Sequence, residues 1–183
     1  MKENDLRVIK TRKALSSSLY QLLEQHLFQS ITVNQICDNA LVHRTTFYKH
    51  FYDKYDLLEY LFNELAKGFF AADIKQRLHH PFQTMNDNIS NKEELQKIAN
   101  LQEEDAEFNK ALKNVCINVM KKDIKNNISR IKVDDTIPDD LIYYIYGGLL
   151  DGFMAWIKNE DITMSPQEID LIFNKSITLK IED

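Results

Sequence analysis

Glycine and proline are scarce in this chain, with four and three residues respectively among 183. Both residue types are common in the turns that join β-strands, and no run of alternating β-branched residues bounded by such turns is present. The sequence therefore predicts an all-α protein with long helices. The two cysteines, Cys37 and Cys116, are too few and too widely spaced for a disulfide framework or a thiolate metal site, so free thiols are expected.

Segments that would enter a membrane or direct export are also lacking. Residues 142–157 form the most apolar stretch, but they include Asp151 and are shorter than the roughly 20 apolar residues that a membrane span needs. Residues 1–5 are charged, and no apolar run follows them. Because apolar residues make up 44% of the chain, a buried core is expected instead, in a cytoplasmic protein with no membrane partner.

Signals for catalysis are absent as well. The sequence holds no glycine-rich phosphate loop, no His-Glu-x-x-His pair and no nucleophile elbow. His79 and His80 are neighbours, so on a helix their side chains point in different directions and make a poor metal pair. The sequence therefore predicts neither an enzyme nor a bound cofactor.

Charge is distributed unevenly along the chain. The net charge of −5 by itself argues against a nucleic-acid partner. Residues 1–54, however, carry eight Lys and Arg against five Asp and Glu, whereas residues 55–183 carry fifteen against twenty-three. A basic N-terminal part on an acidic body indicates a polyanionic partner at one end of the molecule.

A helix-turn-helix pattern lies inside the basic part. Leucines at helical spacing predict a first helix over about residues 5–26. Thr32 and Gln35 form a capping box for a second, short helix, and a turn at residues 41–42 separates it from a third over residues 44–51. Two short helices joined in this way are typical of proteins that place the second of them in the major groove of DNA.

The third helix is expected to have a buried and an outward face. With Phe47 at the centre of the buried face, Phe51 lies about 40° away, whereas Thr45 and Lys49 point about 160° to 200° away. Polar outward groups can meet phosphates and base edges, and no carboxylate occurs between residues 43 and 52. The candidate DNA-contacting residues in and around this helix are Thr32, Arg44, Thr45, Thr46, Tyr48, Lys49, His50 and Lys54.

The rest of the chain is predicted to be helical with one interruption. A long helix capped by Asp53 is expected over residues 54–78, and a loop over residues 81–90. Capping boxes at Asn91 and Ser165 start two of the later helices. These later helices are expected over about residues 91–109, 111–131, 138–158 and 165–179.

Residues 32–58 resemble the DNA-binding segment of the tetracycline-repressor (TetR) family of bacterial regulators. The matching residues are Thr32, Val33, Ile36, Cys37, Ala40, Val42, Thr46, Phe47, Tyr48, His50, Phe51, Lys54, Leu57 and Leu58. Two positions depart from the family pattern. Leu41 replaces a turn glycine, which strains the chain if the turn needs a positive φ, and His43 replaces a Ser or Thr cap.

The resemblance implies both a fold and a partner. We expect a three-helix DNA-binding domain over residues 1–53, joined by a long helix to a helical regulatory and dimerisation domain over residues 54–183. A homodimeric repressor would place two recognition helices about 34–36 Å apart on a pseudo-palindromic operator. Two alternatives stay open: a DNA-bound coactivator controlled by a partner protein, and a helical adaptor that binds protein.

The C-terminal part resembles the dimerisation helices of the same family. Residues 147–157 match its penultimate helix, and residues 165–168 match the entry to its final helix. Gly148 and Gly152 lie four residues apart, hence on one helical face, and permit close helix approach. The residues that the resemblance implies at a dimer interface are Gly148, Gly152, Trp156, Ile169 and Phe173.

A ligand pocket between the central helices is a further implication of the resemblance, with a small molecule that weakens DNA binding. The aromatic candidates for its lining are Phe69, Phe70, Phe108, Tyr143 and Tyr146. Aromatic residues at helical spacing also fit a plain core. Some similar regulators respond to a partner protein instead of a small molecule, so the nature of the effector stays open.

Overall fold

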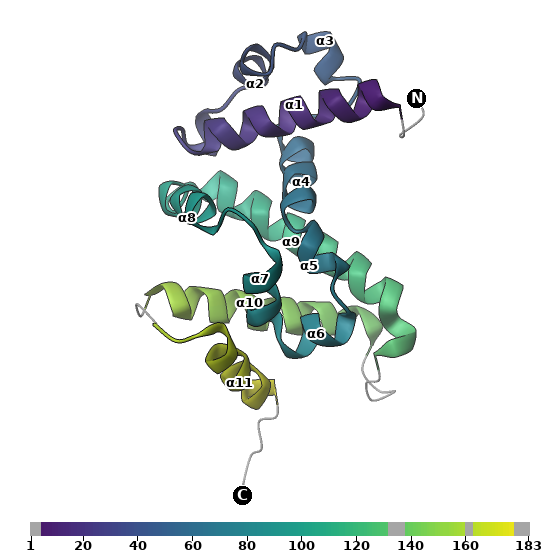
Figure 1. The fold of residues 1–183 in the computed structure, drawn as a ribbon, viewed down its shortest axis with the longest axis vertical. Helices are drawn as coiled ribbons and strands as arrows, with labels where there is room; N and C mark the ends of the chain where they lie inside the picture. The colour runs from purple at the N-terminus through teal and green to yellow at the C-terminus, as the bar shows by residue number, and fades with distance from the viewer. Residues whose placement is uncertain (1–4, 132–137, 160–162, 178–183) are drawn as a thin grey trace, which may run out of the picture. The chain divides into compact units, whose positions relative to one another are not determined.

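Helices make up the regular structure of this chain (Figure 1). The computed structural model describes residues 5–131, 138–159 and 163–177, and these hold eleven α-helices and two short 3-10 helices without a β-strand. The predicted all-α class is therefore confirmed. Within the described ranges, each helix is too short or too polar to cross a membrane.

Two compact units form, and each is assembled from two stretches of the sequence. Unit 1 consists of residues 1–65 and 90–115, and unit 2 consists of residues 66–89 and 116–183. The position predicted as a domain boundary, after residue 53, lies inside unit 1. The N-terminal helices thus fold together with a segment from the middle of the chain.

Unit 1 contains the helix-turn-helix. Its helices are α1 (Leu6–Leu23), α2 (Val33–Asn39), α3 (Arg44–Phe47), α4 (Lys54–Leu65), α8 (Lys92–Leu101) and the first half of α9 (Ala106–Asn127). Helix α1 packs against both α2 and α4, and α2 packs against α3. The side chains at the centre of this core, with at most 2% of their surface exposed, are Leu15, Leu19, Leu23, Phe28, Ile31, Ile36, Phe47 and Leu57.

Local capping signals in unit 1 follow the sequence closely. Thr32 Oγ1 accepts from the N–H of Gln35 at 3.2 Å, and the Gln35 side chain accepts from the N–H of Thr32 at 2.8 Å. The predicted capping box is thereby confirmed. Asp53 Oδ1 accepts from the N–H groups of Tyr55 and Asp56, both at 2.9 Å, so its predicted capping role is confirmed too.

Unit 2 has a smaller core. Its helices are α5 (Lys67–Ala71), α6 (Ile74–His79), α7 (Pro81–Asn88), the second half of α9, α10 (Asp139–Asn159) and α11 (Pro166–Ile177). Helix α11 packs on α7, and Phe173 lies edge-on against the rings of both Phe82 and Tyr146. The capping box at the start of α11 is confirmed: Ser165 donates its N–H to Glu168, and Ser165 Oγ accepts from the N–H of Glu168.

Two predictions about the segment 54–90 are wrong. The expected helix over residues 54–78 is divided into α4, α5 and α6. The expected loop over residues 81–90 is largely helix α7. Both Asp170 oxygens accept from the first turn of α7, from the N–H groups of Phe82 and Gln83 at 2.9 Å each. That cap comes from α11, so no local signal predicted it.

The expected break between the next two helices is also displaced. Helix α8 ends at Leu101 and α9 begins at Ala106, whereas the sequence predicted continuous helix over residues 91–109. The capping box expected at Asn91 is wrong as well. Asn91 is in the left-handed region with φ 57°, and its side chain makes no capping bond.

Gly68 in α5 lies against the end of α7. A Cβ built on Gly68 would overlap the carbonyl oxygen of Asn88, which is backbone and cannot turn aside. A Cβ built on Gly147 in α10 meets only the flexible side chain of Met120, at 3.9 Å. Two glycines of the same unit therefore differ in how much room they have.

We expect Gly68→Ala to destabilise the protein, because overpacking of this kind costs about 1–3 kcal/mol and the gain in helix propensity offsets only part of it. Gly147→Ala is the matched control, and we expect it to be neutral or stabilising by up to about 1 kcal/mol. Denaturant unfolding followed by circular dichroism measures both changes. Equal stability of the two variants would contradict the close contact between α5 and α7.

Candidate nucleic-acid interface

Helix α3 is held to unit 1 by two phenylalanines. Phe47 is fully buried and Phe51 is 4% exposed, as the helical wheel predicted. Regular α-helix ends at Phe47, earlier than expected, but the chain continues in tight turns in which the N–H groups of His50 and Phe51 both reach the carbonyl of Phe47 at 2.9 Å. Residues 48–51 therefore keep a nearly helical path, and the outward face continues along them.

The outward face is polar and exposed. Arg44, Thr45 and Lys49 are exposed, and Tyr48 presents 49% of its surface. The Arg44 guanidinium lies over the Tyr48 ring, 5.5 Å from its centroid, and donates to the Tyr48 hydroxyl at 3.2 Å. The face thus combines cations and hydroxyls with side chains that are free to extend from a rigid base.

Three further candidate residues border this face with different surroundings. Thr46 is half-buried, and Thr32 is exposed but already caps α2. His50 is half-buried, and its Nδ1 is buried without a hydrogen-bond partner among the described residues. Burial lowers the pKa of His50 below its usual value, and the charges of Arg12 and Lys49 lower it further. At neutral pH its imidazole is therefore uncharged.

The turn before α3 has the strain that the sequence suggested. Leu41 adopts φ 54°, a left-handed conformation that favours glycine, and 93% of its side chain is exposed. His43, which stands where the family pattern has a Ser or Thr cap, makes no side-chain capping bond to α3. Both features leave the buried face of α3 unchanged.

The connection between α1 and α2 is held by buried polar side chains from outside the helix-turn-helix. Gln102 accepts from the N–H of Phe28 at 2.8 Å and donates to the carbonyls of Leu23 and His26. Asp105 accepts from the N–H of Gln29 at 2.8 Å and caps α9 through the N–H of Phe108. Gln102 and Asp105 are both fully buried.

Sequence analysis missed these two residues. Asp105 directly precedes α9 and accepts from the N–H of Phe108, three residues later. This is a local capping signal, but it was overlooked because one continuous helix was predicted over residues 91–109. Gln102 has no such signal, because its partners lie more than 70 residues away.

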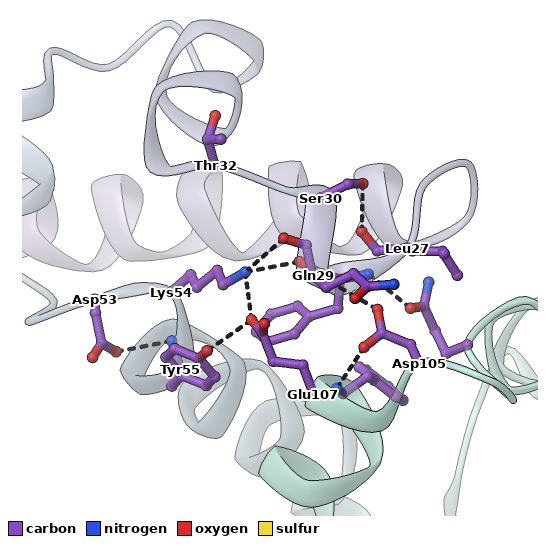
Figure 2. Close-up of polar contacts among 12 residues, drawn as sticks. Leu27, Gln29, Ser30, Thr32, Asp53, Lys54, Tyr55, Asp105 and Glu107 are labelled. Carbon is purple, nitrogen blue, oxygen red and sulfur yellow. Dashed lines mark hydrogen bonds and ion pairs between the residues drawn. The ribbon is translucent and has the colours of Figure 1, made fainter.

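Lys54, predicted to contact phosphate, already has partners inside unit 1 (Figure 2). Its ammonium donates to the carbonyls of Phe28 at 2.9 Å and Gln29 at 3.4 Å, and it pairs with Glu107 at 2.7 Å. The backbone N–H groups of Tyr55 and Asp56, at the start of α4, are capped by Asp53. Lys54 therefore differs from Arg44 and Lys49, which lie on the exposed face.

Four of the five residues predicted to line a ligand pocket have aromatic or core contacts inside their own units. Phe108 packs edge-on against Phe28 in the core of unit 1. Tyr146 packs in the core of unit 2 and donates its hydroxyl to the Arg77 carbonyl at 2.8 Å, and burial raises its pKa. Phe69 and Phe70 lie edge-on against each other, whereas the Tyr143 side chain is outside the described residues. Their common role in a pocket stays a prediction.

The residues predicted at a dimer interface separate into two groups. Ile169 is 6% exposed and Phe173 is fully buried, because both pack within unit 2 against Phe82. Both side chains are thus buried within the single chain, and their place at a dimer interface stays a prediction. Helix α7, which the sequence did not predict, supplies the internal partner for this face of α11.

Gly148, Gly152 and Trp156, in contrast, line an open apolar groove of about 400 Å³ on α10, with Ile172 of α11 beside them. Among the residues that the structure describes, a Cβ built on Gly148 or Gly152 meets no other atom within 4 Å. Ile145 on the same helix and Leu171 on α11 are 58% and 57% exposed. Among the described residues, α10 and α11 thus share an apolar strip that includes exposed side chains.

Comparison with known proteins finds similarity in structure alone. No protein-family model and no curated protein matches the chain. The fold is similar to that of NalD, the secondary repressor of the MexAB-OprM multidrug efflux pump in Pseudomonas aeruginosa, over 94% of this chain and 96% of NalD, with 16% sequence identity and a TM-score of 0.52. NemR of E. coli in its reduced form aligns with 14% identity over 91% of this chain and 97% of its own, with a TM-score of 0.47. The likeness to NalD establishes a shared fold and leaves the function to be argued from the site.

We expect Leu41→Gly to stabilise the protein by about 0.5–1 kcal/mol. Glycine removes the left-handed strain of roughly 1–2 kcal/mol, its greater freedom in the unfolded chain offsets part of that gain, and the exposed leucine side chain contributes little packing. Leu41→Ala is the control, because it removes the same apolar surface and keeps the strain. The midpoint of thermal unfolding should rise for Leu41→Gly alone, and an equal rise in both variants would show that strain is not the cause.

Proposed function

We propose that this chain is a DNA-binding transcriptional regulator that acts as a homodimeric repressor on a pseudo-palindromic operator. The observation that carries the proposal is the exposed face of α3. Arg44, Thr45 and Lys49 extend into solvent from a helix whose other side is anchored by Phe47 and Phe51. A short rigid helix with cations and hydroxyls on its free side fits the major groove, where such groups meet base edges and phosphates.

The surroundings of this face support a polyanionic partner. Arg7, Lys10 and Lys13 are exposed on the first half of α1, at a spacing that places them on neighbouring parts of one helical surface. Arg12 is different, because its guanidinium lies 5.8 Å from the centroids of both the Phe51 and the Tyr60 rings. Phosphate contacts are therefore assigned to the exposed cations, whereas neutral His50 is expected to act only as a hydrogen-bonding group.

A homodimer is supported by the apolar surface of α10. Leu141, Ile145, Gly148, Gly152 and Trp156 fall on one stripe of this helix, which at 1.5 Å per residue is about 31 Å long. Leu141 and Ile145 are 43% and 58% exposed, and Gly148 and Gly152 are exposed too. Exposed apolar residues along a long helix indicate a surface that another chain covers, and small residues at its centre allow two helices to approach closely. We propose that α10 of a second copy covers it, with Leu171 and Ile172 of α11 taking the place predicted for Ile169 and Phe173.

Lys49→Ala is expected to weaken binding to a duplex selected from random DNA about tenfold at low salt and to reduce the slope of log affinity against log salt by about 0.9, because one phosphate contact is lost. Lys97→Ala is the control, since Lys97 is an exposed lysine of α8 in the same unit. Fluorescence anisotropy across a salt series measures both.

A wild-type chain that retains no duplex, but captures a protein partner regardless of salt, would support the adaptor alternative.

Gly152→Glu is expected to convert the dimer to a monomer, because a carboxylate buried between two apolar helices loses its hydration without a partner. The control is Ala99→Glu, which adds the same charge at an exposed position of α8. Sedimentation velocity gives the oligomeric state. A dimer that survives Gly152→Glu would remove the α10 surface from the proposed interface.

A further inference from the structure

The Lys54 ammonium is fully engaged in the free protein. An ammonium has three N–H donors, and its three neighbours here are the carbonyls of Phe28 and Gln29 and the carboxylate of Glu107. Its side chain is 14% exposed, and the Phe28 ring centroid lies 4.4 Å away. The Lys54 side chain is thus turned toward partners within the protein (Figure 2).

Glu107 differs from the other two partners. It lies in the first turn of α9, outside the helix-turn-helix, and 35% of its side chain is exposed. The same oxygen that meets Lys54 also accepts from the Tyr55 hydroxyl at 2.7 Å. The hydrogen bond from Lys54, and next that from Tyr55, hold the pKa of Glu107 below its usual value, while the bond to Glu107 raises the pKa of Tyr55 to about 12. The carboxylate is therefore ionised at neutral pH.

An ionised carboxylate and a DNA phosphate present the same kind of acceptor to an ammonium. We propose that Glu107 occupies Lys54 in place of a DNA phosphate, so that DNA binding exchanges one oxyanion for the other. The contact is autoinhibitory: it lowers the affinity for DNA by holding back one cation of the interface. This inference rests on the proposed function and adds a means of regulating the same surface.

The exchange is physically accessible. A partly exposed ion pair is weak, because water screens it on its open side, so a phosphate displaces the carboxylate at small cost. The two backbone carbonyls belong to the α1–α2 connection, and that of Phe28 also accepts from the N–H of Ile31 at 3.1 Å, a bond that remains when the ammonium turns. Because Asp53 caps the start of α4, the ammonium is the group that α4 offers to a phosphate.

The test is Glu107→Gln, which keeps the shape of the side chain and its ability to accept from Tyr55 but removes the charge. We expect DNA affinity to rise about three- to tenfold and the salt slope to steepen by about 0.9, because Lys54 becomes available to a phosphate. Glu104→Gln is the matched control. Glu104 is exposed in the turn before α9, so its substitution removes an equal charge nearby without touching Lys54.

A double-mutant cycle with Lys54→Gln separates the proposal from a general charge effect. The gain from Glu107→Gln should vanish in the Lys54→Gln background if Glu107 acts through Lys54. An equal gain in both backgrounds, or no gain in either, would overturn the proposal. Circular dichroism shows whether each variant is folded, and a stoichiometric titration with DNA gives the fraction of each variant that binds.

Tyr55→Phe is a second, milder variant in case Lys54→Gln disturbs the α1–α2 connection. It removes the hydroxyl that holds the Glu107 oxygen and keeps the ring against Phe28. We expect a smaller gain in affinity in the same direction, and a loss would count against the autoinhibitory contact. A wild-type chain that binds no DNA from a random pool removes the proposed function itself, whereas unchanged affinity of Glu107→Gln for DNA that the wild type binds removes only this inference.

Discussion

Unit 1 depends on satisfying the backbone of a buried connection. The chain between α1 and α2 is not helical throughout, so several of its N–H and C=O groups need partners from elsewhere, and each one left unpaired in the core would cost about 1–3 kcal/mol. Gln102 supplies three bonds and Asp105 a fourth, and both are fully buried. Removing either would leave buried groups unpaired rather than merely delete a contact. The helix-turn-helix and the α8–α9 segment therefore form one folding unit.

This constraint extends to the candidate DNA-contacting surface. Phe28 and Gln29 donate their N–H groups to Gln102 and Asp105, respectively. The carbonyls of the same two residues accept from the Lys54 ammonium. One connection is thus fixed by side chains from the α8–α9 junction and in turn fixes the start of α4. The position of α3 relative to α1 and α4 then follows from Phe47 and Phe51, which are buried in the same core.

Electrostatics distinguish the two sides of unit 1. The exposed cations of α1 and α3 are free to meet a polyanion, whereas the cation at the start of α4 is neutralised by the first turn of α9. The acidic residues of the chain are therefore not only a solvated surface. At Glu107 one of them pairs with a lysine of the basic N-terminal part, so the charges of the two parts are locally balanced there.

In unit 2, too, a helix cap from a residue distant in sequence decides which side chains are buried. Asp170 of α11 caps α7, and this joins the two helices so that Phe173 is buried between Phe82 and Tyr146. The groove lined by Gly148 and Gly152 of α10 lies in the same unit, beside Ile172 of α11.

Some features of this protein were determined by the sequence alone because their partners are local. The capping pairs of Thr32 with Gln35 and Ser165 with Glu168 lie within one helical turn, and the buried and outward faces of α3 follow from a period of 3.6 residues. The strain at Leu41 was expected only if the turn needs a positive φ, and that expectation came from the resemblance to a family with glycine at this position. Tertiary structure alone decided that Asp170 caps α7, that Ile169 faces inward and that Lys54 is occupied. In each of these cases the deciding partner, such as Asp170 for α7 at 88 residues from Phe82, is distant in sequence, and only folding brings it within hydrogen-bonding or packing range.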